Sequence, residues 1–168
     1  MNGQLQNIDH GALKANQLVI ITLNAVAFVL NIPWLAALVA LAMLIGTALG
    51  KPGFGFIYKS ALKPLGLVKP DILPDNPEPH RFAQGFGGVV MLAGAVSLFA
   101  GASALGWGLV WLVIALAALN AFGGFCAGCF VYYWLTRFGV PGFIKTPPAG
   151  VFPGMRPKEG IAHESYDI

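Results

Sequence analysis

Two long stretches of the chain contain no charged residue, and each is long enough to cross a lipid bilayer twice. Neither residues 15–50 nor residues 82–136 include Lys, Arg, Asp or Glu. The hydrocarbon core of a bilayer is about 30 Å thick, and one helical crossing needs about 20 apolar residues. A water-soluble protein would place charges on the outward faces of such helices. The pattern therefore predicts an integral membrane protein.

Turn-forming residues divide these stretches into four predicted helices. Asp9 suits the N-cap of the first helix, and Pro33 suits the first turn of the second, after a tight turn. The predicted fold is all-α, with four transmembrane helices arranged as two helical hairpins that point in the same direction. The crossings are expected at about residues 11–30, 33–49, 82–104 and 107–135. Together they form one transmembrane domain, residues 1–137.

The segments outside these helices differ in composition. Residues 54–63 combine apolar side chains with Lys59 and Lys63, which predicts a short helix lying in the membrane interface. Residues 64–80 contain five prolines and are expected to form an extended loop. Residues 138–168 are rich in Pro and Gly and too poor in apolar residues to fold alone, which predicts an extended tail.

The position of the basic residues predicts the orientation of the chain. Only 10% of the residues are charged and 57% are apolar, whereas about 25% are charged in soluble proteins. The ten basic residues lie at the start of the first predicted helix, between the second and the third, or after the fourth: Lys14, Lys51, Lys59, Lys63, Lys69, Arg81, Arg137, Lys145, Arg156 and Lys158. By the positive-inside rule, both termini and the loop of residues 64–80 are expected in the cytoplasm.

The same distribution argues against several functions. The basic residues adjoin the predicted membrane surface rather than forming a patch, so the lipid bilayer is an expected partner and nucleic acid is not. Apart from Lys14, at the start of the first predicted helix, the two predicted hairpins contain no Asp, Glu, Lys or Arg that could carry protons or ions. A pump or an ion-coupled transporter is therefore not expected.

The only two cysteines, Cys126 and Cys129, have CxxC spacing. Three positions apart on a helix, their sulfur atoms would face the same way. If Gly123 and Gly124 interrupt the fourth helix, the cysteines begin a new helix, whose free amides lower the pKa of a thiol. Near the cytoplasmic interface, such a pair would act as a redox pair that exchanges a disulfide or a sulfur atom with a partner. The alternative is that both cysteines are small apolar packing residues.

A metal site within one chain is not expected. A zinc ion needs about four ligands, and His10, His80 and His163 are each isolated in the sequence, as is usual for solvent-exposed loop residues. Two chains could pool their cysteine pairs in a dimer, an alternative that remains open. No motif in the chain identifies a cofactor.

Two segments resemble a known family. Residues 81–85 read RFAQG, and residues 120–129 read NAFGGFCAGC, which follows the pattern N-x-x-x-G-F-C-x-G-C. These segments are similar to those of the bacterial integral-membrane family named domain of unknown function 4395. The resemblance implies a location in the bacterial cytoplasmic (inner) membrane. It also implies a thioredoxin-like protein or a sulfurtransferase as the partner of Cys126 and Cys129.

The tail supports a second functional hypothesis. Within residues 138–168, apolar side chains such as Phe143, Val151, Phe152 and Met155 could dock on a neighbouring subunit. The protein would then be a non-catalytic accessory subunit of a larger respiratory, photosynthetic or transport complex. The cysteine pair favours thiol chemistry, whereas the absence of a basic residue near the cysteines in the sequence favours the accessory role. Both hypotheses remain open at this point.

Overall fold

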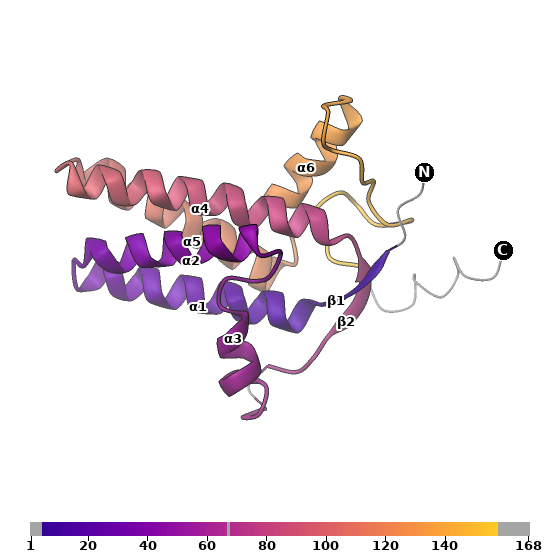
Figure 1. The fold of residues 1–168 in the computed structure, drawn as a ribbon, viewed down its shortest axis with the longest axis horizontal. Coiled ribbons are helices and arrows are strands. Elements are labelled where there is room, and N and C mark those ends of the chain that lie inside the picture. Colours follow the sequence, from indigo (N-terminus) through magenta and orange to yellow (C-terminus); the bar gives the residue numbers. More distant parts are fainter. Residues whose placement is uncertain (1–4, 67, 158–168) are drawn as a thin grey trace.

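The computed structural model describes residues 5–66 and 68–157, and it is mostly helical (Figure 1). Long helices lie side by side in a bundle: α1 (His10–Val29), α2 (Pro33–Ala48), α4 (Pro77–Phe99) and α5 (Ser103–Gly123). Helix α4 packs against α2 and α5, and α1 also packs against both. Helices α1, α4 and α5 are long and apolar enough to cross a membrane, while the apolar α2 has only 16 residues.

Small and large apolar side chains are distributed as expected for a bundle surrounded by lipid. The side chains with no exposed surface at the centre of the bundle include Ala27, Ala36, Val39, Met91 and Val110. Large apolar side chains instead cover the outside: Val29, Trp34, Leu49 and Phe122 are each at least two-thirds exposed. Close packing of helices through small residues, with large apolar residues facing outward, is typical of membrane helices.

The ends of the first two helices follow from local chemistry. Asp9 is the N-cap of α1, and its carboxylate accepts a hydrogen bond from the Ala12 amide, as predicted. Pro33 occupies the first turn of α2, where its missing N–H costs nothing. Asn31 adopts a positive φ of 50° in the turn between the two helices, a conformation that asparagine tolerates better than most residues.

A small sheet corrects the all-α prediction. Strand β1 (Gln6–Asp9) pairs antiparallel with β2 (Ile72–Asp75), and β2 lies inside the segment expected to be a loop, residues 64–80. Helix α4 also starts at Pro77, five residues before the expected position 82, because proline suits the first turn of a helix. The sheet lies at the end of the bundle opposite the turns that join α1 to α2 and α4 to α5 (Figure 1).

Residues 54–62 form a short helical segment beside the sheet. Helix α3 (Gly55–Ile57) continues into a π-helical turn, η1 (Tyr58–Leu62), with Phe54 and Tyr58 buried and Lys59 exposed. The Tyr58 hydroxyl donates a 2.8 Å hydrogen bond to Asp9 Oδ2. Burial and this contact raise the pKa of Tyr58 to about 12. The segment is therefore anchored to the start of α1.

The fourth predicted helix is interrupted, as expected from its two glycines. Helix α5 ends at Gly123, and Gly124 adopts a left-handed conformation with φ of 64°. A separate helix, α6 (Ala127–Arg137), follows, and its axis is inclined to the axes of the bundle helices (Figure 1). Residues 107–135 therefore do not form one continuous helix, because Gly124 allows the chain to turn.

The described part of the tail folds back on its own chain. Phe143 packs against Phe82 and Tyr132. Residues 151–157, called here the C-terminal strap, return to the start of α6: the Cys126 amide donates to Gly154 O at 2.7 Å. The Arg156 amide donates to Gly124 O at 2.9 Å. Residues 138–157 are thus held by contacts within the chain, and the rest of the predicted tail lies outside the described residues.

Candidate functional site

Cys126 and Cys129 form a disulfide at the start of α6, with their Cα atoms 5.2 Å apart. Cys126 is the N-cap residue, and its Sγ accepts a hydrogen bond from the Cys129 amide at 3.2 Å. Both residues are buried, with 5% and 3% of their surface exposed. The break after Gly124 therefore places the sulfur of Cys126 at a helix N-terminus, where the amide and the helix dipole favour a thiolate.

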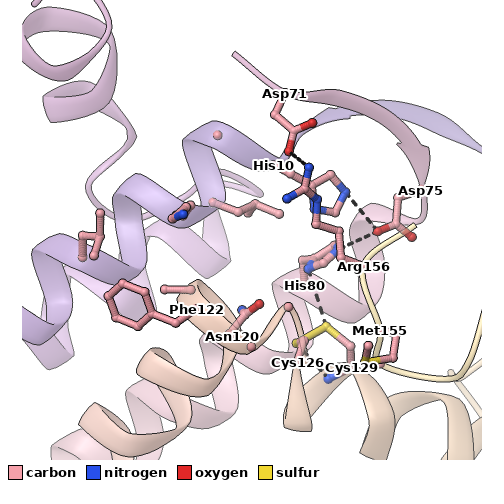
Figure 2. A pocket seen from close by; sticks show the side chains of 18 of the residues that line it. His10, Asp71, Asp75, His80, Asn120, Phe122, Cys126, Cys129, Met155 and Arg156 are labelled. Atoms are coloured by element: carbon pink, nitrogen blue, oxygen red, sulfur yellow. Dashed lines mark hydrogen bonds and ion pairs between the residues drawn. A yellow bond between two sulfur atoms is a disulfide. The ribbon is translucent and has the colours of Figure 1, made fainter. Parts of the chain in front are cut away.

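His80 connects this disulfide to a buried carboxylate. From the first turns of α4, its Nδ1 lies 3.5 Å from Cys129 Sγ, and its Nε2 lies 2.9 Å from Asp75 Oδ2 (Figure 2). An ionised carboxylate only accepts hydrogen bonds, so the ring proton belongs on Nε2. Nδ1 then presents its lone pair to the sulfur of Cys129.

A second histidine, His10, also lies beside Asp75. Asp75 lies at the end of β2 with 4% of its surface exposed, and the Asn76 amide donates to its Oδ1 at 2.8 Å. His10 Nε2 lies 3.3 Å from Asp75 Oδ2, outside hydrogen-bond geometry. Burial alone would raise the pKa of Asp75, but the contacts with His10 and His80 outweigh it and hold this pKa below the usual carboxyl range.

The interpretation of the histidines as isolated loop residues is wrong for His10 and His80. His10 is the first residue of α1 and His80 lies in α4, and their rings meet edge to face with centroids 5.5 Å apart. His163 lies outside the described residues. The pairing of β1 with β2 explains the encounter. It sets Ile72 opposite Asp9 and Asp71 against the start of α1, so the end of β2 and the first turn of α4 lie within reach of the His10 side chain.

These groups line one cavity of about 600 Å³ (Figure 2). Its wall includes the cysteine pair, both histidines and Asp75, together with Arg156 from the C-terminal strap. Arg156 forms an ion pair with Asp71 at the rim. The walls of the cavity are thus formed by α1, the segment around β2, α4, the junction of α5 and α6, and the C-terminal strap. Through this cavity small molecules can reach the buried site.

The arrangement supplies the parts that thiol chemistry needs. A thiolate at Cys126 would be stabilised by the Cys129 amide. After reduction, Cys129 could pass its proton to Nδ1 of His80, while Asp75 orients the ring through Nε2. The cysteines were singled out by their spacing in the sequence. The histidines and Asp75 were missed, and the one available signal was that His10 and His80 lie near the starts of the first and third predicted helices, at the end where the cysteines are.

Comparison with known proteins identifies a family but no characterised relative. Neither the curated proteins nor the solved structures contain a significant match. One family model matches residues 8–137, which cover all the described helices and both cysteines. The chain therefore belongs to the family described as "Domain of unknown function (DUF4395)".

Proposed function

We propose that this protein is a membrane-embedded thiol–disulfide exchange protein that uses Cys126 and Cys129 as its redox pair. The observation that carries the proposal is the 3.5 Å contact between His80 Nδ1 and Cys129 Sγ, with Asp75 behind the ring. A cysteine kept only for packing has no need of an oriented imidazole at its sulfur.

The disulfide passes from this protein to its partner in two steps. A partner thiol gives its proton to Nδ1 of His80 as its sulfur attacks Cys126 Sγ. A mixed disulfide forms, the bond between Cys126 and Cys129 breaks, and the proton passes from Nδ1 to Cys129 Sγ. The second partner thiol then loses its proton to solvent and attacks the partner sulfur of the mixed disulfide, which releases Cys126 as a thiolate that the Cys129 amide stabilises. Two electrons and one proton thus pass from the partner dithiol to this protein, and the partner leaves with a disulfide.

The position of the site supports a cytoplasmic partner. The sheet and α6 lie at one end of the bundle (Figure 1), and the two cysteines belong to the start of α6. The turns at the other end, residues 30–32 and 100–102, carry no Lys or Arg. With four crossings, all basic residues lie on the side of the site, which the positive-inside rule assigns to the cytoplasm. A thioredoxin-like protein has the required dithiol. A sulfur relay would need only one persulfide-bearing cysteine, so the closed pair favours disulfide exchange.

The accessory-subunit hypothesis is the second candidate. Phe143 packs within the chain on Phe82 and Tyr132. Phe152 stacks on Phe130, with ring centroids 6.2 Å apart, but 62% of its surface stays exposed. Contacts within the chain thus hold the described part of the tail without a neighbouring subunit, while Phe152 still offers an apolar surface to one.

Redox titration with trapping tests the proposal. The purified protein is equilibrated in glutathione buffers of stepped potential and its thiols are labelled with a maleimide of high mass. We expect one two-electron transition involving both cysteines. The partner for trapping is a thioredoxin whose second cysteine is replaced by serine and whose first cysteine carries a small aromatic thiol as a mixed disulfide. The Cys126 thiolate of the Cys129→Ser variant should displace the aromatic thiol and accumulate a stable mixed disulfide, because neither protein has a resolving thiol.

The Cys126→Ser variant is the matched control, since it has the same change in composition but lacks the cysteine at the helix N-terminus. It should trap much less partner. Labelling that is independent of the buffer potential, together with no trapped complex in either variant, would contradict the proposal and leave both cysteines as packing residues.

A further inference from the structure

We infer that His10, Asp75 and His80 form a binding site for a divalent transition-metal ion, beside the cysteine pair (Figure 2). The inference goes beyond thiol exchange, because none of these three ligands is a cysteine. It also reverses the expectation, drawn from the sequence alone, that no metal site exists within one chain.

The distances from each histidine nitrogen to the carboxylate oxygen are close to the spacing that a metal ion requires. His10 Nε2 and His80 Nε2 lie 3.3 Å and 2.9 Å from Asp75 Oδ2, and the three ligand atoms lie within 4.8 Å of one another. Bonds of about 2.0–2.2 Å at tetrahedral or octahedral angles place neighbouring ligand atoms about 3.0–3.6 Å apart. Small side-chain rotations are enough to admit an ion.

An unsatisfied nitrogen points to the missing ligand. His10 lines the cavity and is 8% exposed, and its buried Nε2 has no hydrogen-bond partner among the described residues, since its 3.3 Å contact with Asp75 Oδ2 lacks hydrogen-bond geometry. Buried polar atoms are rarely left unpaired, because leaving one without a partner costs free energy. A metal ion at this point would satisfy His10 Nε2 and bind Asp75 and His80 at the same time.

The three ligands are held in place by different elements. The backbone amide of His10 donates to Asp71 O at 2.7 Å, which fixes the start of α1 against the segment leading into β2. Asp75 is fixed through its Oδ1 by the Asn76 amide, so Oδ2 remains for the ion. Helix α4 carries His80. Ligands fixed in this way lose little freedom when they bind an ion.

The chemistry of the ligand set defines the class of ion. Two imidazole nitrogens and one carboxylate oxygen suit zinc, iron(II), cobalt(II) or manganese(II) rather than calcium or magnesium. Three protein ligands leave coordination positions open, and these would face the cavity of about 600 Å³. The ion replaces the proton on His80 Nε2, so Nδ1 carries the ring proton and donates it toward Cys129 Sγ. Metal occupancy thereby sets the direction of the hydrogen bond between His80 and Cys129.

A competing ligand set shares His80. The ligand atoms of His80, Cys126 and Cys129 also lie within 4.8 Å of one another. That set needs the disulfide to be reduced first, because the two sulfur atoms are bonded to each other. It would also leave His10 Nε2 unpaired. The set of two histidines and one aspartate needs no bond to break and leaves no ligand unused.

Cobalt(II) titration of the oxidised protein distinguishes the two sets. The protein is stripped with a chelator, its disulfide is verified by maleimide labelling, and Co²⁺ is added while absorption is recorded. We expect one equivalent to bind, with visible d–d bands and no intense sulfur-to-cobalt charge-transfer band. The Cys126→Ser/Cys129→Ser double variant should bind Co²⁺ equally well, although it has lost thiol exchange.

Substitution of His10 tests the ligand assignment. His10→Gln should weaken Co²⁺ binding by at least about 100-fold, since even partners outside the first coordination shell contribute about 10- to 100-fold. Asn120→Ala is the matched control, because Asn120 lines the same cavity without belonging to the ligand set. Helix content and thermal unfolding verify that each variant folds. If His10→Gln does not fold, Asp75→Asn provides a second test of the ligand assignment.

Three results would overturn the inference. The first is the absence of Co²⁺ binding by the folded, oxidised protein. The second is binding that requires reduction and is lost in the double cysteine variant, which would assign the ion to the cysteines. The third is unchanged affinity in folded His10→Gln and Asp75→Asn variants. Because the double cysteine variant lacks exchange but keeps the metal ligands, failure of one proposal leaves the other standing.

Discussion

His80 Nδ1 lies 3.5 Å from Cys129 Sγ, although 49 positions separate the two residues in the chain. The contact exists because α6 packs against the first part of α4. Gly128 permits this packing: a Cβ at this position would lie 2.5 Å from Cβ of Ala83. The imidazole therefore reaches the sulfur through a close approach of two helix backbones.

Replacing His80 should slow disulfide exchange without unfolding the protein. In a chelating buffer at pH 7, we expect His80→Ala to reduce the rate of reduction by thioredoxin by about 100-fold, the lower end of general acid–base contributions. The rate is followed by maleimide labelling of quenched samples. Lys145→Ala, which removes a 3.3 Å ion pair with Glu78 at the same end of the molecule, should keep the full rate. Equal rates in both variants would exclude a role for His80 in proton transfer.

Asp75 should make stability depend on acidic pH. Its contacts with the two histidines hold its pKa in the folded protein below the usual carboxyl value. A lowered pKa in the folded state stabilises the protein above the unfolded-state pKa of about 4, and this stabilisation is lost as the pH falls further. In chelating buffer, the unfolding temperature of the wild type should thus fall more steeply between about pH 5 and pH 3 than that of Asp75→Asn. Parallel slopes would contradict this.

Gln84 should be a major contributor to the stability of the bundle. Its amide nitrogen donates to Met43 O at 3.1 Å and Lys51 O at 3.1 Å, and its oxygen accepts from the Gly53 amide at 3.2 Å. Gln84→Leu leaves the partly buried Gly53 amide without its acceptor, which costs about 1–3 kcal/mol, whereas Met43 O keeps the hydrogen bond from the Thr47 hydroxyl. Thermal unfolding in detergent should show a clear loss. Ser97→Ala, which removes a bond within α4 only, should change little.

The C-terminal strap should limit access to the disulfide. Gly154 has a φ of 85°, and a Cβ there would lie 2.9 Å from Cys126 O. Gly154→Ala should therefore displace the strap and accelerate reduction of the disulfide by thioredoxin. Gly142→Ala is the matched control, because Gly142 also has a positive φ, 93°, but a Cβ there would meet nothing within 4 Å. A slower reaction in Gly154→Ala alone would instead make the strap part of the partner-binding surface.

The bundle could be predicted from the sequence because its signals are local. Absence of charge over residues 15–50 and 82–136 marks the apolar helices, and Asp9 and Pro33 mark two of their starts. The break at Gly124 follows from the backbone freedom of glycine. Each of these features is determined by residues that are neighbours in the chain.

The sheet and the histidine cluster could not be predicted in the same way. Gln6 pairs with Asp75 across 69 positions, and strands of four residues are too short for a clear alternation of polar and apolar positions. The contact between Asp75 and His80 is local, since five positions separate them, but only the strand pairing brings the two residues to His10. The meeting of both histidines with Asp75 is therefore a consequence of tertiary structure, and it cannot be seen in the pattern of single residues along the chain.

The contact between Gly128 and Ala83 also limits how this redox pair can vary. The two residues between the cysteines of a CxxC pair are a natural place to adjust its chemistry, by mutation or by design. At Gly128, any side chain would collide with Cβ and Cα of Ala83, at 2.5 Å and 2.7 Å. Of the two positions between the cysteines, only Ala127 can then accept a larger side chain. A change at Gly128 would require a smaller residue at position 83 as well, and glycine is the only residue smaller than alanine. Adjustment of the pair should therefore proceed through Ala127 and through the residues that surround the sulfur atoms from α4 and the strap.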